Sequence, residues 1–171
     1  MSVNIQRLLA LAHLFNIKDF VETGTQNGDL FLAVEHHFDR AFTIDIDGPT
    51  PRLETKFANS NRVFLFKGSS GNELGRILQE HKITRALFWL DAHGNRTFFV
   101  DDGADQIPQE LDAITRLAPD SLVVIDDVTW ERGFHWVNSS YKLWIPAGWQ
   151  VKYVGRAAIL HRGEYSTLEH I

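Results

Sequence analysis

The segment that most constrains the fold is Ala86–Leu90, an unbroken apolar run that includes two aromatic side chains. A run of this length without a turn former is typical of a strand covered on both faces, as in a parallel sheet. Asp91 and His93 follow it directly, so an acid and an imidazole lie at the carboxyl end of the predicted strand. Because ligands of open α/β sheets bind beyond the carboxyl ends of the strands, a functional site is expected here.

A second predicted strand, Ser121–Ile125, has the same pattern of an apolar run followed by acids, here Asp126 and Asp127. With Asp91, three carboxylates would then converge at the ends of two successive strands. Like charges repel, so a bound cation or a raised pKa is expected to resolve the conflict. Hard cations such as Mg²⁺ or Ca²⁺ prefer oxygen ligands. The alternative for Asp126 and Asp127 is a strand-end turn that caps a helix.

The rest of the chain alternates between strand-like and helix-like apolar patterns, which predicts βαβ units and a parallel sheet. Residues 1–171 are interpreted as one doubly wound, Rossmann-like α/β domain. Two final strands flank Gly155-Arg156, a turn short enough for an antiparallel hairpin. The additional strands are predicted at 19–23, 41–46, 62–67, 149–154 and 157–161. The helices are predicted at 3–15, 29–37, 52–58, 72–81 and 108–117, with a loop and then a helix within 128–144.

Composition excludes several classes of partner. The chain has 171 residues, 17 basic and 22 acidic, and a net charge of −5, so a surface that follows nucleic acid phosphates is not expected. There is no cysteine, which excludes disulfides and a thiolate nucleophile. No signal peptide or apolar run of about 18 residues is present, so a cytoplasmic protein without membrane partners is expected. The segment 97–100 is interpreted as a lid or a homodimer contact.

The segment Glu22–Gly28 joins the first strand to its helix with the spacing E-x-G-x-x-x-G. Glycines at such a turn let the backbone approach a ligand and adopt positive φ. The dinucleotide fingerprint is not met because Gln26 occupies the second glycine position, and no Walker A lysine follows. The loop suits a ligand with an adenosine and a zwitterionic tail. A generic βα turn is the alternative.

Two further positions fit an adenosine ligand. Asp45 ends the second strand, 23 residues after Glu22, where a carboxylate commonly accepts both ribose hydroxyls. Asp47 is the competing candidate, and a solvated turn acid is the alternative for both. Ser69 follows the third strand and could contact an adenine edge, although Ser69 and Ser70 could equally cap the next helix.

In the order of these motifs the chain resembles the class I S-adenosylmethionine-dependent methyltransferases. The resemblance extends from Phe20 to His161 and rests on segments 21–28, 43–47 and 67–70. It implies a seven-stranded sheet of order 3-2-1-4-5-7-6 with S-adenosylmethionine as cofactor. The residues implied to bind the cofactor are Glu22, Gly24, Thr25 and Gly28 at its methionine end, Asp45 at the ribose and Ser69 at the adenine.

The acids after the fourth and fifth strands are similar in placement to the metal ligands of catechol-type and sugar O-methyltransferases. By this resemblance Asp91, Asp126 and Asp127 are the metal ligands, with Mg²⁺ the expected cation. A bound cation would hold a substrate hydroxyl and lower its pKa. His93 is the first candidate for the general base and Asp91 the second. The chain departs from the catechol type at Gly94, where those enzymes carry a lysine.

The sequence therefore predicts a divalent-metal-dependent O-methyltransferase that acts on a small hydroxylated molecule such as a sugar or a catechol. Two alternatives stay open. The first is a non-catalytic module that keeps the cofactor-binding fold. The second is a metal-dependent hydrolase in which Asp91 and His93 activate water, because Asp91-Ala-His93 also resembles a motif of arginase-type ureohydrolases. That motif would require an acid at Asn95.

Overall fold

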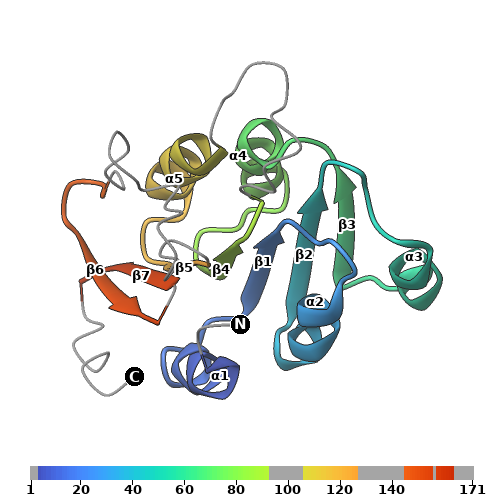
Figure 1. Cartoon of the computed structure of the whole chain (residues 1–171), viewed down its shortest axis with the longest axis horizontal. Coiled ribbons are helices and arrows are strands. Elements are labelled where there is room, and N and C mark those ends of the chain that lie inside the picture. The colour runs from blue at the N-terminus through green and yellow to red at the C-terminus, as the bar shows by residue number, and fades with distance from the viewer. Residues whose placement is uncertain (1–3, 93–105, 127–144, 156, 164–171) are drawn as a thin grey trace.

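The computed structural model describes residues 4–92, 106–126, 145–155 and 157–163. They form a single seven-stranded sheet with helices on both faces (Figure 1). The candidates His93 and Asp127, the segment 97–100 and the region 128–144 lie outside the described residues. No helix among those described is long and apolar enough to span a bilayer.

The elements follow the predicted order, and most bounds agree to within one or two residues. The strands are β1 (Asp19–Thr23), β2 (Arg40–Asp45), β3 (Val63–Lys67), β4 (Ala86–Leu90), β5 (Leu122–Ile125), β6 (Trp149–Val154) and β7 (Ala157–Arg162). The helices are α1 (Ile5–Leu14), α2 (Asp29–Val34), the 3₁₀ turn η1 (Glu35–His37), α3 (Pro51–Phe57), α4 (Ser70–Glu80) and α5 (Gln106–Leu117). The helix predicted over 29–37 is thus α2 followed by η1, because its last turn tightens to 3₁₀ geometry, a common helix ending.

The strand order is β3-β2-β1-β4-β5-β7-β6, which confirms the predicted topology. The first five strands in this order pair in parallel, whereas β7 is antiparallel to both β5 and β6. Every residue of β1, β4 and β5 is buried. This burial explains why β4 and β5 are apolar on both faces instead of alternating, whereas β1 carries polar residues towards its two ends, at Asp19, Glu22 and Thr23.

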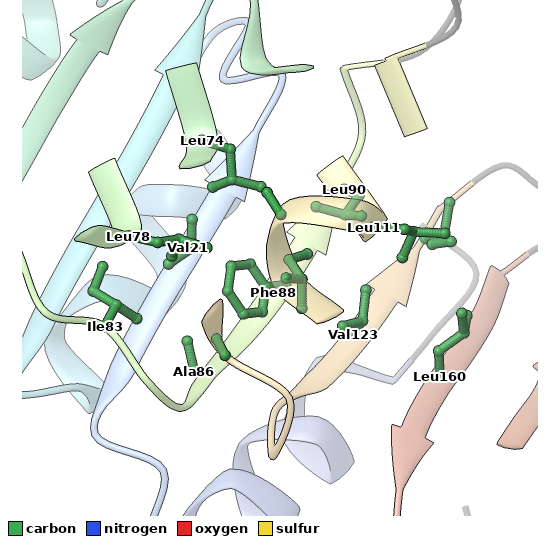
Figure 2. Close-up of a cluster of buried hydrophobic side chains, with 14 of the residues drawn as sticks. Val21, Leu74, Leu78, Ile83, Ala86, Phe88, Leu90, Leu111, Val123 and Leu160 are labelled. Carbon is green, nitrogen blue, oxygen red and sulfur yellow. The ribbon is translucent and has the colours of Figure 1, made fainter. Parts of the chain in front are cut away.

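Alternate side chains of each strand enter two separate cores. Helices α4 and α5 cover one face, where Val21, Phe88 and Val123 pack (Figure 2). Helices α1, α2 and α3 cover the other, where Phe20, Leu87 and Val124 lie. Successive residues of a strand point to opposite faces, so each central strand contributes to both cores.

An ion pair fixes the amino-terminal ends of the central strands. The Arg40 guanidinium donates to both carboxylate oxygens of Asp19, over 2.8 and 2.6 Å, and to the carbonyl of His81 over 2.8 Å. This bidentate contact joins β1 to β2 at the end of the sheet opposite the carboxyl ends of the strands. It has a structural role.

Candidate cofactor site

The candidate residues that the structure describes gather at the carboxyl ends of β1, β2, β3, β4 and β5. Two hydrogen bonds extend the ladder just past these ends: the amide of Asp91 donates to the Thr23 carbonyl at 3.0 Å, and that of Asp126 to Leu90 at 3.1 Å. The parallel register therefore brings residues far apart in the sequence to one edge of the sheet. This edge is where open α/β folds bind ligands.

The loop between β1 and α2 depends on two glycines. Gly24 has φ of +82°, and a Cβ there would lie 2.4 Å from the carbonyl oxygen of Asp91. Gly28 has φ of +76°, and a Cβ there would lie 2.7 Å from the side chain of Leu53 in α3. Only glycine combines positive φ with so close an approach of neighbouring atoms. The loop thus keeps its backbone directly against the end of β4 and against α3.

A buried chain of hydrogen bonds lies beneath this loop. Glu22 is only 2% exposed, and its Oε2 accepts a hydrogen bond of 2.6 Å from the Thr43 hydroxyl. Thr43 has one hydrogen to give, so the Thr25 hydroxyl donates to Thr43 Oγ1, at 2.5 Å. The side chain of Thr25, a predicted cofactor residue, is therefore engaged within the protein.

Glu22 is held in a neutral state near pH 7. Burial is the largest cause and raises the pKa of its carboxyl from 4.5 to about 8. The hydrogen bond from Thr43 lowers this pKa, and the negative charges of Asp91 and Asp45 raise it. A cation placed beside Glu22 would offset these effects and favour the ionised form.

The carboxylate of Asp45 connects β2 to the glycine loop. Its Oδ2 accepts from the amide of Gln26 and its Oδ1 from the amide of Asp47, each at 2.9 Å. A carboxylate offers about four acceptor positions, so two bonds leave capacity for a ligand's hydroxyls. Asp45 is partly buried and Asp47 is exposed. Of the two competing candidates, Asp45 is the one built into the site.

A small pocket opens between these elements. It is lined by Gly24, Ile44, Ile46, Gly68, Ser69, Ser70, Ala92 and Gln106. Ile44 and Ile46 provide apolar surface, and the two serines and Gln106 provide polar groups. Such a mixture is typical of small-molecule sites. Ser69 occupies the N-cap position of α4 but makes no capping bond with its side chain. Its hydroxyl instead donates to Gln106 Oε1 at 2.5 Å.

Two of the predicted metal ligands are within the described residues. Asp91 and Asp126 follow the paired residues Leu90 and Ile125 of β4 and β5. They therefore occupy matching positions just past the ends of two neighbouring strands, and Asp126 is buried. Within the described residues, no three His, Cys, Asp or Glu side chains come together as a metal site. Carboxylate oxygens are the donors that a hard divalent cation prefers, and the third predicted ligand, Asp127, is outside the described residues.

Three polar residues of the site were not predicted from the sequence: Thr43, Gln106 and Ser70, for which only a helix-capping role was predicted. The sequence does offer one indication for Thr43, because it is the single polar residue within the apolar segment Ala41–Ile44. It offers none for Gln106, because the contact of this residue with the turn after β3 depends on how α5 packs against α4.

Comparison with known proteins finds solved structures that share this fold. No protein-family model matches the chain, and no curated protein matches its sequence. A candidate caffeoyl-CoA O-methyltransferase from Staphylococcus aureus superposes with a TM-score of 0.58 at 13% identity, covering 95% of this chain and 85% of that one. Human methyltransferase-like protein 13, solved in complex with SAH, gives 0.52 at 16% identity, covering 96% and 78%.

A methyltransferase from Silicibacter pomeroyi gives a TM-score of 0.51 at 16% identity, covering 92% of this chain and 89% of that one. At these identities the similarity establishes the fold. The chain has the Rossmann-like fold of the S-adenosylmethionine-dependent methyltransferases, with the seven-stranded sheet and the carboxyl-terminal antiparallel hairpin.

Proposed function

We propose that this chain is an S-adenosylmethionine-dependent methyltransferase. The observation that carries the proposal is the pocket among Gly24, Ile44 and Ser70, with the acids Glu22 and Asp45 at the ends of the adjoining strands. The fold supports it, since the structural neighbours include methyltransferases and one complex with SAH.

The residues present fit such a cofactor. Glu22, Gly24 and Gly28 would hold its methionine end, where a backbone without side chains permits close approach. A neutral, buried Glu22 would ionise beside the ammonium group of the ligand. Asp45 would accept from the ribose hydroxyls, and Thr25 would support the loop from below through Thr43. When bound, the cofactor supplies an electrophilic methyl group.

We further propose that the acceptor is a hydroxyl of a small molecule such as a sugar or catechol. The acids Asp91, Asp126 and Asp127 would hold a divalent cation, Mg²⁺ by preference, that lowers the pKa of the acceptor hydroxyl. His93, or else Asp91, would accept the proton that this hydroxyl releases. Several acids at one edge suit vicinal hydroxyls, which can share one cation.

Titration calorimetry with S-adenosylhomocysteine and S-adenosylmethionine, with and without Mg²⁺, tests the proposal. Binding of both ligands is expected, followed by methyl transfer to a member of a hydroxyl acceptor panel. Absence of binding would refute the methyltransferase assignment. Binding without turnover on any acceptor would favour a non-catalytic cofactor-binding module.

A further inference from the structure

A second cavity lies at the amino-terminal ends of β1 and β2, at the end of the sheet opposite the candidate cofactor site. Its volume is about 180 Å³, against about 60 Å³ for the pocket at the carboxyl ends. Apolar cavities of about 150 Å³ bind benzene, so this cavity can admit a group the size of a ring. It lies between α1, η1 and the segments that lead into the two strands.

The cavity forms where the chain leaves α1 and enters the sheet. The Asn16 amide donates to the His13 carbonyl at 3.0 Å, and the Ile17 amide donates to the Ala12 carbonyl at 2.8 Å. Asn16 has φ of +53°. These are the features of a Schellman motif, in which a left-handed residue reverses the chain after a helix. The chain therefore turns from α1 directly into β1 (Figure 1), and Lys18 comes to lie beside the helix end.

The inner surface of the cavity is apolar. Ala12, Ile17 and Phe38 are buried, and Leu9 is partly buried. All four belong to the core on the α1 side of the sheet, or pack against it. A ligand that covers this surface with an apolar group removes that surface from water, which favours binding.

The rim of the cavity carries one permanent cation and one permanent anion, Lys18 and Asp39. Both side chains are exposed, and the Asp39 amide donates to the Lys18 carbonyl at 2.8 Å. Among the described residues these two side chains form no ion pair with each other, because the neighbouring Arg40 is paired with Asp19 and Lys18 with no acid. A ligand with a single charge would meet one attractive and one repulsive partner at this rim.

We propose that this cavity binds a free amino acid with an apolar side chain. The carboxylate of the ligand pairs with Lys18, its ammonium group pairs with Asp39, and its side chain covers the apolar inner surface. His13 and His37 also line the cavity, and an imidazole offers at least one N–H to the carboxylate in either protonation state. Charge complementarity carries the inference, since a zwitterion satisfies both charges of the rim at once.

This binding site is separate from the proposed cofactor site. The two lie at opposite ends of β1, whose five residues span roughly 16 Å. The inference therefore does not rest on the proposed function.

NMR titration with four probes tests the proposal, with the shifts of the Ile17 and Asp39 amides as the measurement. The probes are L-phenylalanine, L-phenylalaninamide, 3-phenylpropanoate and glycine. The amide lacks the carboxylate, the propanoate lacks the ammonium group, and glycine lacks the ring. The wild-type protein is expected to bind phenylalanine about fivefold more tightly than either singly charged analogue, as for the loss of one exposed ion pair. Glycine is expected to bind more weakly than phenylalanine because it buries no ring.

Two variants assign the charges to their partners. Lys18→Met keeps an apolar stem without the ammonium group, so it is expected to bind phenylalanine and phenylalaninamide equally. Asp39→Asn is expected to bind phenylalanine and 3-phenylpropanoate equally. Lys82→Met and Asp47→Asn, which change exposed residues of the same types outside the cavity, are the matched controls and should keep the wild-type preferences.

Three results would overturn the inference. They are the absence of amide shifts with all four probes, equal wild-type affinity for phenylalanine and its two singly charged analogues, and wild-type preferences that persist in both Lys18→Met and Asp39→Asn. The spectrum of each variant also reports whether it is folded. No S-adenosylhomocysteine is present in this assay, so failure here leaves the proposed function standing, and failure of the cofactor to bind leaves this inference standing.

Discussion

Substitution of Glu22 by glutamine should change how the stability of the fold depends on pH. The pKa of this carboxyl is 4.5 in an unstructured chain and about 8 in the folded protein, chiefly because of burial. Below pH 4.5 the carboxyl is protonated in both the folded and the unfolded state, so it does not change the free energy of unfolding. Between 4.5 and about 8 the unfolded chain ionises first, so the stability of the folded state falls as pH rises.

The size of this loss follows from the difference between the two pKa values. At 1.36 kcal/mol for each pH unit, it amounts to about 5 kcal/mol above pH 8, an upper limit because water entering the site would solvate the charge. Glu22→Gln keeps an oxygen that accepts from Thr43 but cannot ionise. The variant is therefore expected to match the wild type near pH 4 and to exceed its stability by several kcal/mol near pH 9.

Urea denaturation of both proteins from pH 4 to pH 9 measures this effect. Asp47→Asn, which removes an exposed carboxylate nearby, is the control and should leave the wild-type profile unchanged. If the free energy of unfolding has the same pH dependence in Glu22→Gln and wild type, the reasoning about the buried carboxyl is refuted.

Three further substitutions address the loop, the core and the acidic edge. Gly24→Ala should weaken S-adenosylhomocysteine binding, and it should lower the free energy of unfolding by more than Gly163→Ala does. Both glycines have positive φ, but of the two only Gly24 packs against the backbone of Asp91. Equal losses for the two variants in urea denaturation would contradict this. Phe88→Ala should cost about 3–5 kcal/mol in the same assay, since the ring is fully buried; a cost under about 1 kcal/mol would show that the core collapses around the gap. Asp126→Asn should reduce methyl transfer while leaving S-adenosylhomocysteine affinity nearly intact; parallel loss of both would remove this residue from a metal-binding role.

Much of the fold could be predicted because its strands carry local signals. The segment Ala86–Leu90 is apolar throughout, and the pairing of β4 with both β1 and β5 accounts for this. The turn at Gly155 predicted the antiparallel hairpin, which the structure confirms. The positive φ of Gly24 and Gly28 was likewise expected from the spacing of the loop.

The contacts that complete the site lacked such signals. Glu22 meets Thr43 because the two residues are partners in the register of β1 and β2. Gln106 meets Ser69 because α5 lies beside α4 (Figure 1). Neither contact connects residues close in sequence, so no local pattern predicts it.

The sequence by itself determined which residues form strands, which turns need glycine and which acids follow the strands, because each depends on neighbours along the chain. Only the tertiary structure decided that Glu22 is buried and neutral, that Thr25 bonds within the protein, and that the buried Ser70 hydroxyl has no hydrogen-bond partner among the described residues. These properties depend on desolvation and on hydrogen-bond geometry between elements, which exist only once the sheet and its helices have packed.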